Sequence, residues 1–72
     1  MRLNWHKIPY EGGFMLYVDD MLAAYVHQPR LDVYGVRMYN GSTWVPVGEF
    51  PTREEAQQCA ELLAPIYAGF TE

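Results

Sequence analysis

Apolar and polar residues alternate along most of the first fifty positions, which is the period-two pattern of β-strands with one buried face. The alternation predicts strands over residues 3–10, 14–18 and 31–39, and a further strand that begins at Trp44. Residues 21–28 fit either a strand or a short helix. Eight residues without a capping box make a weak helix, and both neighbouring segments are strand-like, so we favour the strand.

Four short segments rich in glycine, proline, aspartate or asparagine separate these strands, at residues 11–13, 19–20, 28–30 and 40–41. These residue types fix φ or tolerate positive φ, and they therefore favour turns and loops. We expect a turn at each segment and antiparallel pairing between the strands on either side.

Asn40-Gly41 is the strongest hairpin signal in the chain, because both residues accept the positive φ angles of a two-residue turn. Such a turn pairs Tyr39 with Ser42 and places Arg37 directly opposite Trp44. Since side chains alternate along a strand, this register also decides which residues share a face of the sheet.

The predicted hairpin has one apolar face and one mixed face. The apolar face, which we expect to pack on a helix, consists of Tyr34, Val36, Met38, Val45 and Val47. The opposite face holds Arg37, Tyr39, Ser42 and Trp44. A single helix covers one face of a sheet, so we expect the second set to be exposed.

The clearest helix signal follows the last strand. Thr52 and Glu55 stand at the capping-box spacing, and acidic residues in the first turn complement the helix dipole. Apolar residues then recur at helical period, at Ala56, Cys59, Ala60, Leu63, Ile66 or Tyr67, and Phe70. We expect the helix to run from about Arg53 to Ala64, to end or kink at Pro65, and to be followed by a stop at Gly69.

These elements predict a single small α+β domain over residues 1–72: an antiparallel sheet of about four strands with one C-terminal helix packed on one face. Six tyrosines, three phenylalanines and two tryptophans are more aromatic residues than so small a core can enclose. Some of them are therefore expected at the surface or in a contact between subunits.

The net charge of −4 and the scattered positions of the five basic residues disfavour direct binding to nucleic acid, which needs a basic patch. There is no apolar run at the N-terminus and no apolar span of eighteen residues, so we expect a cytoplasmic protein that does not enter a membrane. The one cysteine, Cys59, cannot form an internal disulfide. We expect it to be a buried structural thiol in a reducing compartment.

No residue pattern predicts catalysis or a cofactor. His6, His27, Cys59 and the pair Asp19-Asp20 lack the spacings of metal ligands. Cys59 is expected in the core, and Ser42 is expected in a hairpin turn, so neither is a candidate nucleophile. We therefore expect no enzyme, no metal and no cofactor.

The candidate partner-binding residues are Trp44, Arg37 and Tyr39 on the mixed face of the hairpin, together with Trp5. Tryptophan, tyrosine and arginine are the residue types enriched at binding hot spots. An exposed Arg37–Trp44 pair would also stabilise the hairpin through a cation–π contact. Both roles remain open at this point.

Residues 34–60 carry a sheet-then-helix pattern: Tyr34-Gly35-Val36-Arg37, Trp44, Gly48-Glu49-Phe50-Pro51-Thr52-Arg53-Glu54-Glu55-Ala56 and Ala60. This pattern resembles the DNA-binding domain of plant ethylene-response factors, the arm-binding domain of phage tyrosine integrases, and small phage or bacterial proteins of unknown function. Those DNA-binding domains use basic and aromatic residues on the sheet face away from the helix. Here Arg37 and Trp44 correspond, and the further basic residues are missing.

We therefore expect a non-enzymatic protein–protein interaction module, a homodimer through its sheet edge or sheet face. It would be an accessory or inhibitor protein of a phage or mobile element. The alternative is a nucleic-acid-binding module that uses the Arg37/Trp44 face.

Overall fold

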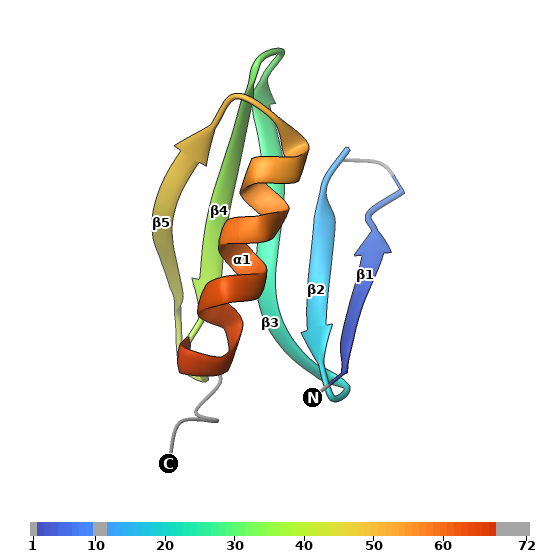
Figure 1. Ribbon diagram of the computed structural model, residues 1–72, viewed down its shortest axis with the longest axis vertical. Coiled ribbons are helices and arrows are strands. Elements are labelled where there is room, and N and C mark those ends of the chain that lie inside the picture. The colour runs from blue at the N-terminus through green and yellow to red at the C-terminus, as the bar shows by residue number, and fades with distance from the viewer. Residues whose placement is uncertain (1, 10–11, 68–72) are drawn as a thin grey trace.

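A computed structural model describes residues 2–9 and 12–67 of the chain. The elements follow in the order β1 (Leu3–Lys7), β2 (Phe14–Val18), β3 (Met21–Arg30), β4 (Val33–Tyr39), β5 (Trp44–Phe50) and α1 (Arg53–Tyr67). The strands form one antiparallel sheet in the order β1-β2-β3-β4-β5, and α1 packs across one face of it (Figure 1). The α+β class and the C-terminal helix are therefore confirmed.

The sheet has five strands rather than about four. Residues 21–28 are a strand, as the sequence favoured, and β3 continues to Arg30 through residues that were predicted as a loop. Pro29 fits within β3 because the pairing of β3 with β4 is irregular between His27 and Arg30. A two-residue turn at residues 31–32 then leads into β4.

The acidic turn between β2 and β3 is as tight as predicted. Asp19 and Asp20 both have positive φ, at 51° and 69°, and aspartate tolerates this conformation better than most residues. Asp19 also ties the turn to the start of β1: the Arg2 N–H donates to Asp19 Oδ1 at 2.8 Å, and the Asp19 N–H donates to the Arg2 carbonyl at 2.9 Å.

The turn between β4 and β5 is longer than predicted. The Asn40 side-chain oxygen accepts hydrogen bonds from the N–H groups of Ser42 and Thr43, both at 2.9 Å. The Asn40 N–H donates to the Thr43 carbonyl at 3.2 Å. Asparagine thus builds a four-residue connection over 40–43, where a two-residue turn was expected.

The longer turn makes the predicted register wrong. Tyr39 pairs with Trp44, and Arg37 pairs with Pro46 instead of standing opposite Trp44. A further shift between Val36 and Arg37 leaves Val47 as an extra residue in β5. The register slips by two residues at the hairpin end, and an even slip preserves the alternation, so Arg37, Tyr39 and Trp44 still share a face.

The helix begins at the predicted cap and ends later than predicted. The Thr52 hydroxyl oxygen accepts the Glu55 N–H at 3.2 Å, and the Glu55 carboxylate lies 3.3 Å from the same hydroxyl. α1 continues through Pro65 to Tyr67, so the expected end at Ala64 is wrong. Tyr67 packs against the core, which favours the extra turn. The expected stop at Gly69 and the expected core residue Phe70 lie outside the described residues.

Small residues form the line of contact between helix and sheet. Ala56, Ala60 and Ala64 are fully buried, and they meet Leu16, Val18, Ala23, Ala24, Val26, Val36 and Met38 of the sheet in one core. Cys59 is partly exposed and lies outside this core cluster, and Ile66 is 58% exposed, so neither is the core residue that was expected. Alanine side chains let the helix approach the sheet closely, and the buried stripe is correspondingly narrow.

Candidate functional site

The sheet face opposite α1 is uncovered among the described residues, and we call it the open face. α1 contacts mainly β3 and β4. The N-terminal strands β1 and β2 extend the sheet sideways instead of folding over the open face (Figure 1). A thin two-layer molecule therefore presents one whole side of its sheet.

Four rings lie in a chain of contacts across β3, β4 and β5 on the open face, and we call them the aromatic row: Tyr39, Trp44, Tyr25 and His27. The Tyr39 and Trp44 ring centroids are 5.1 Å apart, and those of Trp44 and Tyr25 are 6.2 Å apart. Tyr25 and His27 are stacked at 5.5 Å. Each ring in the row is partly buried by its neighbours and partly exposed.

A shallow hollow of about 310 Å³ lies beside the aromatic row, lined by Ile8, Met15, Tyr25, Arg37 and Trp44. Arg37 is exposed and is the one charged side chain of this lining. An apolar floor with one guanidinium at its side suits an apolar or aromatic group that carries negative charge. We call it the central hollow.

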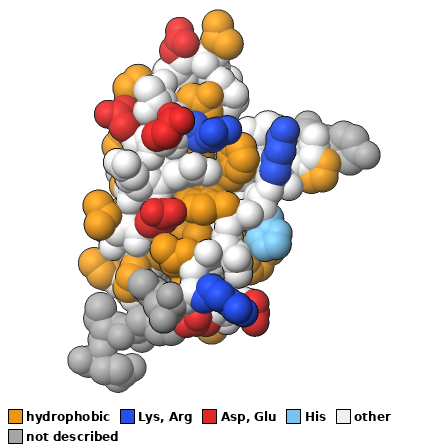
Figure 2. Space-filling model, turned by 45° about the vertical axis from the view of Figure 1, so that its right-hand side comes forward, with side chains coloured by type: hydrophobic (Ala, Val, Ile, Leu, Met, Phe, Trp, Pro, Cys, Tyr) orange, Lys and Arg blue, Asp and Glu red, His pale blue; other side chains and the backbone are white. Residues whose placement is uncertain are grey.

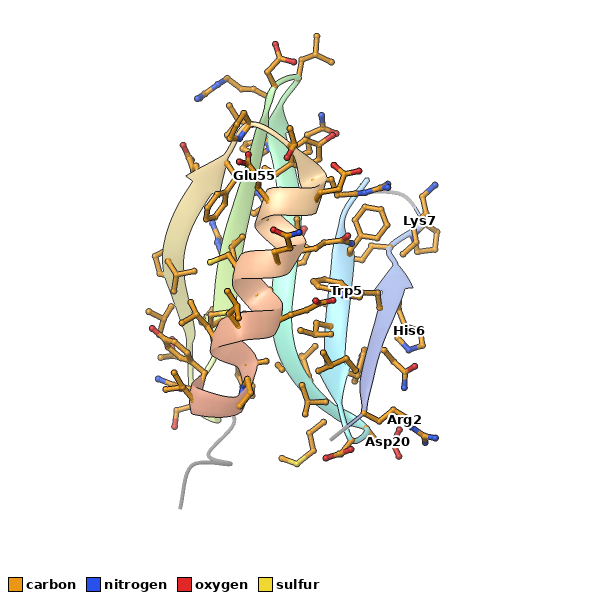
Figure 3. The ribbon with its side chains drawn as sticks, in the orientation of Figure 1. Arg2, Trp5, His6, Lys7, Asp20 and Glu55 are labelled. Atoms are coloured by element: carbon orange, nitrogen blue, oxygen red, sulfur yellow. The ribbon has the colours of Figure 1, made fainter. Side chains whose placement is uncertain are left out.

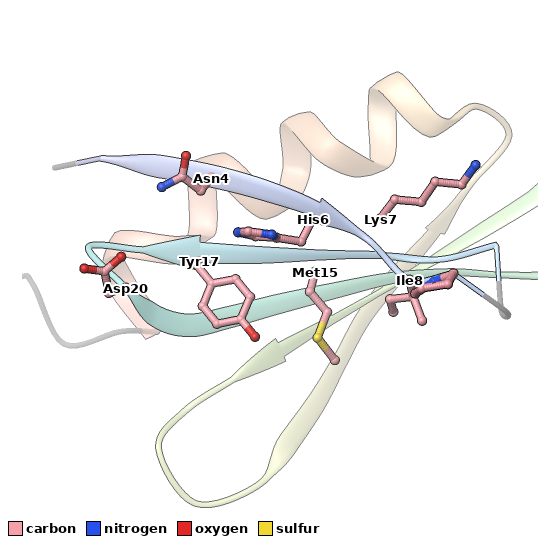
Figure 4. A pocket seen from close by; sticks show the side chains of 8 residues that line it. Asn4, His6, Lys7, Ile8, Met15, Tyr17 and Asp20 are labelled. Carbon is pink, nitrogen blue, oxygen red and sulfur yellow. The ribbon is translucent and has the colours of Figure 1, made fainter.

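A second hollow of about 460 Å³ lies toward the β1 side of the sheet, and we call it the edge hollow. Its lining comprises Asn4, His6, Lys7, Ile8, Pro9, Met15, Tyr17 and Asp20. Ile8 and Met15 line both hollows, so the two are neighbours on this face. Figure 4 shows the Met15, Tyr17 and Ile8 side chains on the side of the sheet away from the helix.

Three of the four candidate partner-binding residues come together, and the fourth does not. Trp44, Arg37 and Tyr39 lie on the open face. Trp5 lies on the covered face beside α1, where its indole N–H donates to Glu61 Oε2 at 2.8 Å (Figure 3). It packs against the core there, so Trp5 is separated from the other three by the thickness of the sheet.

Sequence reasoning missed Tyr25, His27 and Met15 on the open face. The signal that could have found them is alternation across the β3–β4 pairing, which sets Tyr25 opposite Arg37 and His27 opposite Gly35. Gly35 has a further role there: a Cβ at position 35 would lie 2.5 Å from His27 Nε2. The His27 ring therefore occupies the space that a side chain at position 35 would fill.

Charge is distributed unequally between the two sides. The helix carries Glu54, Glu55 and Glu61, and further acidic residues stand in the turns. On the open face, Arg37 of β4 and Glu49 of β5 lie near the aromatic row, and Lys7 and Asp20 line the edge hollow. Figure 2 shows acidic side chains scattered over the side of the molecule that includes the helix. The acidic excess is therefore concentrated away from the aromatic row.

Groups that could do chemistry are dispersed. No set of three or more His, Cys, Asp or Glu among residues 2–9 and 12–67 could hold a metal ion. Burial raises the pKa of the Cys59 thiol, so at neutral pH it is a poorer nucleophile than an ordinary cysteine. In the same part of the chain, no helix has the length and apolar character of a membrane span.

No protein-family model, curated protein or solved structure matches this chain. The candidate site therefore rests on the geometry of the open face.

Proposed function

We propose that this chain is a non-enzymatic protein–protein interaction module and that its open face docks a second copy of the chain. The observation that carries the proposal is the aromatic row on an uncovered sheet face. Tryptophan and tyrosine bring large apolar area to a contact at little cost in side-chain entropy, and they dominate binding hot spots. Stacking two open faces would produce four layers, helix–sheet–sheet–helix, in which each sheet is covered on both sides.

Charge favours the face-to-face orientation for a second copy. Two chains of net charge −4 repel each other, and the repulsion is least when their acidic helices point away from each other. Face-to-face docking achieves this. The open face also carries both Arg37 and Glu49, and a two-fold axis can bring unlike charges of the two copies together.

The width of the sheet and the area of a standard interface indicate how much of the open face such a contact would cover. Five strands at about 4.8 Å spacing make a face about 20 Å wide. A standard protein interface covers about 800 Å² on each partner. A face-to-face dimer would therefore use most of the open face, including both hollows.

Light scattering over a concentration series tests this proposal. We expect a mass of two copies or more, and Trp44→Ala should weaken association at least about tenfold because it removes the centre of the aromatic row. Leu62→Ala is the control, since Leu62 is exposed on the outer side of α1, away from the open face; it should leave the association unchanged. A chain that stays monomeric, or a Trp44→Ala variant that associates like the wild type while remaining folded, would disprove face docking.

The wider setting is also part of the proposal. The resemblance of residues 34–60 is the reason to suggest an accessory or inhibitor protein of a phage or mobile element. A reducing cytoplasm suits a chain whose one cysteine stays a thiol.

One observation favours a second function, the binding of single-stranded nucleic acid. Rings on an open sheet beside an arginine form the kind of platform on which bases stack. Titration of a labelled oligonucleotide at low salt separates the two functions. Absence of binding there removes the nucleic-acid alternative.

A further inference from the structure

The two edges of the sheet differ in how well they are protected against pairing with another strand. In β5, Pro46 has no N–H to donate, and the extra residue Val47 interrupts the ladder. Both features are common devices that prevent edge-to-edge association. β1 is short and ends in Lys7, but it has neither of these two features: its five residues contain no proline or glycine and pair with β2 in one unbroken register.

The hydrogen bonds at the ends of β1 show which of its backbone groups point away from the sheet. The Ile8 N–H donates to the Gly13 carbonyl at 2.8 Å, and the Asp19 N–H donates to the Arg2 carbonyl at 2.9 Å. Even-numbered residues of β1 thus face β2. Backbone groups alternate in direction along a strand, so the outward N–H and C=O groups belong to the odd-numbered residues, Leu3, Trp5 and Lys7.

We infer that β1 pairs antiparallel with β1 of a second copy, about a two-fold axis that passes midway between the two Trp5 residues. The outward residues are spaced symmetrically about Trp5, so the edge is complementary to itself. Trp5 would stand opposite Trp5, and Leu3 opposite Lys7. Each of these pairs would exchange two backbone hydrogen bonds, and the two sheets would join into one of ten strands.

Side chains permit this register. In the joined ladder Lys7 lies opposite Leu3 and His6 lies opposite Asn4, so no like charges face each other. His6 and Lys7 of β1, and Arg2 directly before it, are exposed (Figure 3). A second copy satisfies the whole edge with one symmetric contact, which is why we favour it over an unrelated extended peptide.

The β1 contact is separate from the open face. The aromatic row lies over β3, β4 and β5, whereas β1 is at the opposite end of the strand order. Edge pairing would leave the open faces of both copies on the same side of the joined sheet and bring their edge hollows next to each other. β1 pairing and face-to-face docking are therefore separate proposals, and each can be tested without the other.

The test uses substitutions at Lys7, whose N–H points outward and whose side chain is exposed. Lys7→Pro removes the outward donor and leaves the bonds to β2 in place, and it should weaken the dimer about tenfold or more, since each copy loses a bond. Lys7→Ala keeps the N–H and should associate like the wild type. Sedimentation or light scattering gives the association constants, and a thermal melt verifies that both variants are folded.

Amide hydrogen exchange supplies a second readout, because β1 pairing gives the outward N–H groups new hydrogen-bond partners and face docking does not. The N–H groups of Leu3, Trp5 and Lys7 should become more protected as the protein concentration rises. If their exchange is independent of concentration, or if Lys7→Pro associates like Lys7→Ala, β1 pairing is wrong. If Trp44→Ala loses association and Lys7→Pro does not, face docking is supported and β1 pairing is refuted. If Lys7→Pro loses association and Trp44→Ala does not, β1 pairing is supported and face docking is refuted.

Discussion

Trp5 and Trp44, the two tryptophans of the chain, lie on opposite faces of one sheet and make different contacts. The Trp5 indole N–H donates to Glu61 of the helix, and the ring packs against the core. The Trp44 ring contacts Tyr39 and Tyr25 on the open face. One ring completes the covered face, whereas the other contributes to a surface that the described chain leaves uncovered.

The difference follows from the widths of the two layers. A helix is about 10 Å wide with its side chains, and five strands span about 20 Å. α1 lies close over β3 and β4 through its alanines, so the outer strands need large side chains to reach it. Trp5 does this from β1, and Phe14 does so from β2, where the Arg53 guanidinium lies 5.2 Å from its ring centroid. The open face has no second layer to fill, and its rings pack on one another.

The largest loss of stability is expected from a substitution where the helix and the sheet are closest. Ala60→Leu inserts a larger side chain into the fully buried helix–sheet contact and should lower the free energy of unfolding by about 3 kcal/mol. The matched control is Leu62→Ala on the outer side of α1, where Leu62 is 76% exposed; it should change that free energy by less than about 0.5 kcal/mol. Urea denaturation measures both. Equal effects would show that the alanine stripe does not set the spacing.

The two tryptophans should differ in their contribution to stability. We expect Trp5→Ala to cost about 2 kcal/mol, below the range for fully buried tryptophans because Trp5 is partly exposed. Trp5→Phe keeps the ring packing and loses the bond to Glu61, which is worth about 1 kcal/mol. Trp44→Ala should cost less than about 1 kcal/mol in dilute, monomeric protein. A larger loss for Trp44→Ala than for Trp5→Ala would reverse the assignment of the two faces.

The smallest change in stability is expected from a substitution at Cys59, on the flank of α1 between the covered face and solvent. Burial raises the pKa of this thiol, so folding favours the protonated form. Its contribution is fully present below the unfolded-state pKa and is lost as pH rises through the folded-state pKa. Cys59→Ser should therefore change stability by less than about 0.5 kcal/mol at pH 7.

The stability of Cys59→Ser relative to the wild type should increase as the pH approaches 10. Denaturation of both proteins from pH 7 to 10 measures the difference. A wild type that becomes relatively more stable with rising pH would contradict the direction of the shift.

Local signals predicted most of the secondary structure. Thr52 begins the helix as expected, and the segments 14–18 and 21–28 are strands, because alternation and capping depend on neighbours in sequence. The register of the last hairpin was not predictable in this way. Asn40 can start a two-residue or a four-residue turn, and its side-chain bonds to Ser42 and Thr43 decide for the longer one.

The candidate site was predicted in part. Trp44, Arg37 and Tyr39 share a face under either register, because an even shift leaves alternation intact. Tyr25 and His27 join them through the pairing of β3 with β4, a contact that requires residues 21–28 to be a strand, which the sequence favoured over a short helix. Trp5 was grouped with these residues on composition alone, and its hydrogen bond to Glu61 crosses 56 positions of the chain.

The sequence by itself determined the approximate positions of the strands, the acidic turn at 19–20, the helix cap and the alternation that separates two faces, since each depends on residues a few positions apart. The tertiary structure alone decided which aromatic residues the helix covers and which strands lie at the edges of the sheet. Those outcomes depend on where a narrow helix lies on a wider sheet, and that placement is set by close packing between alanines and strands that are distant in the chain.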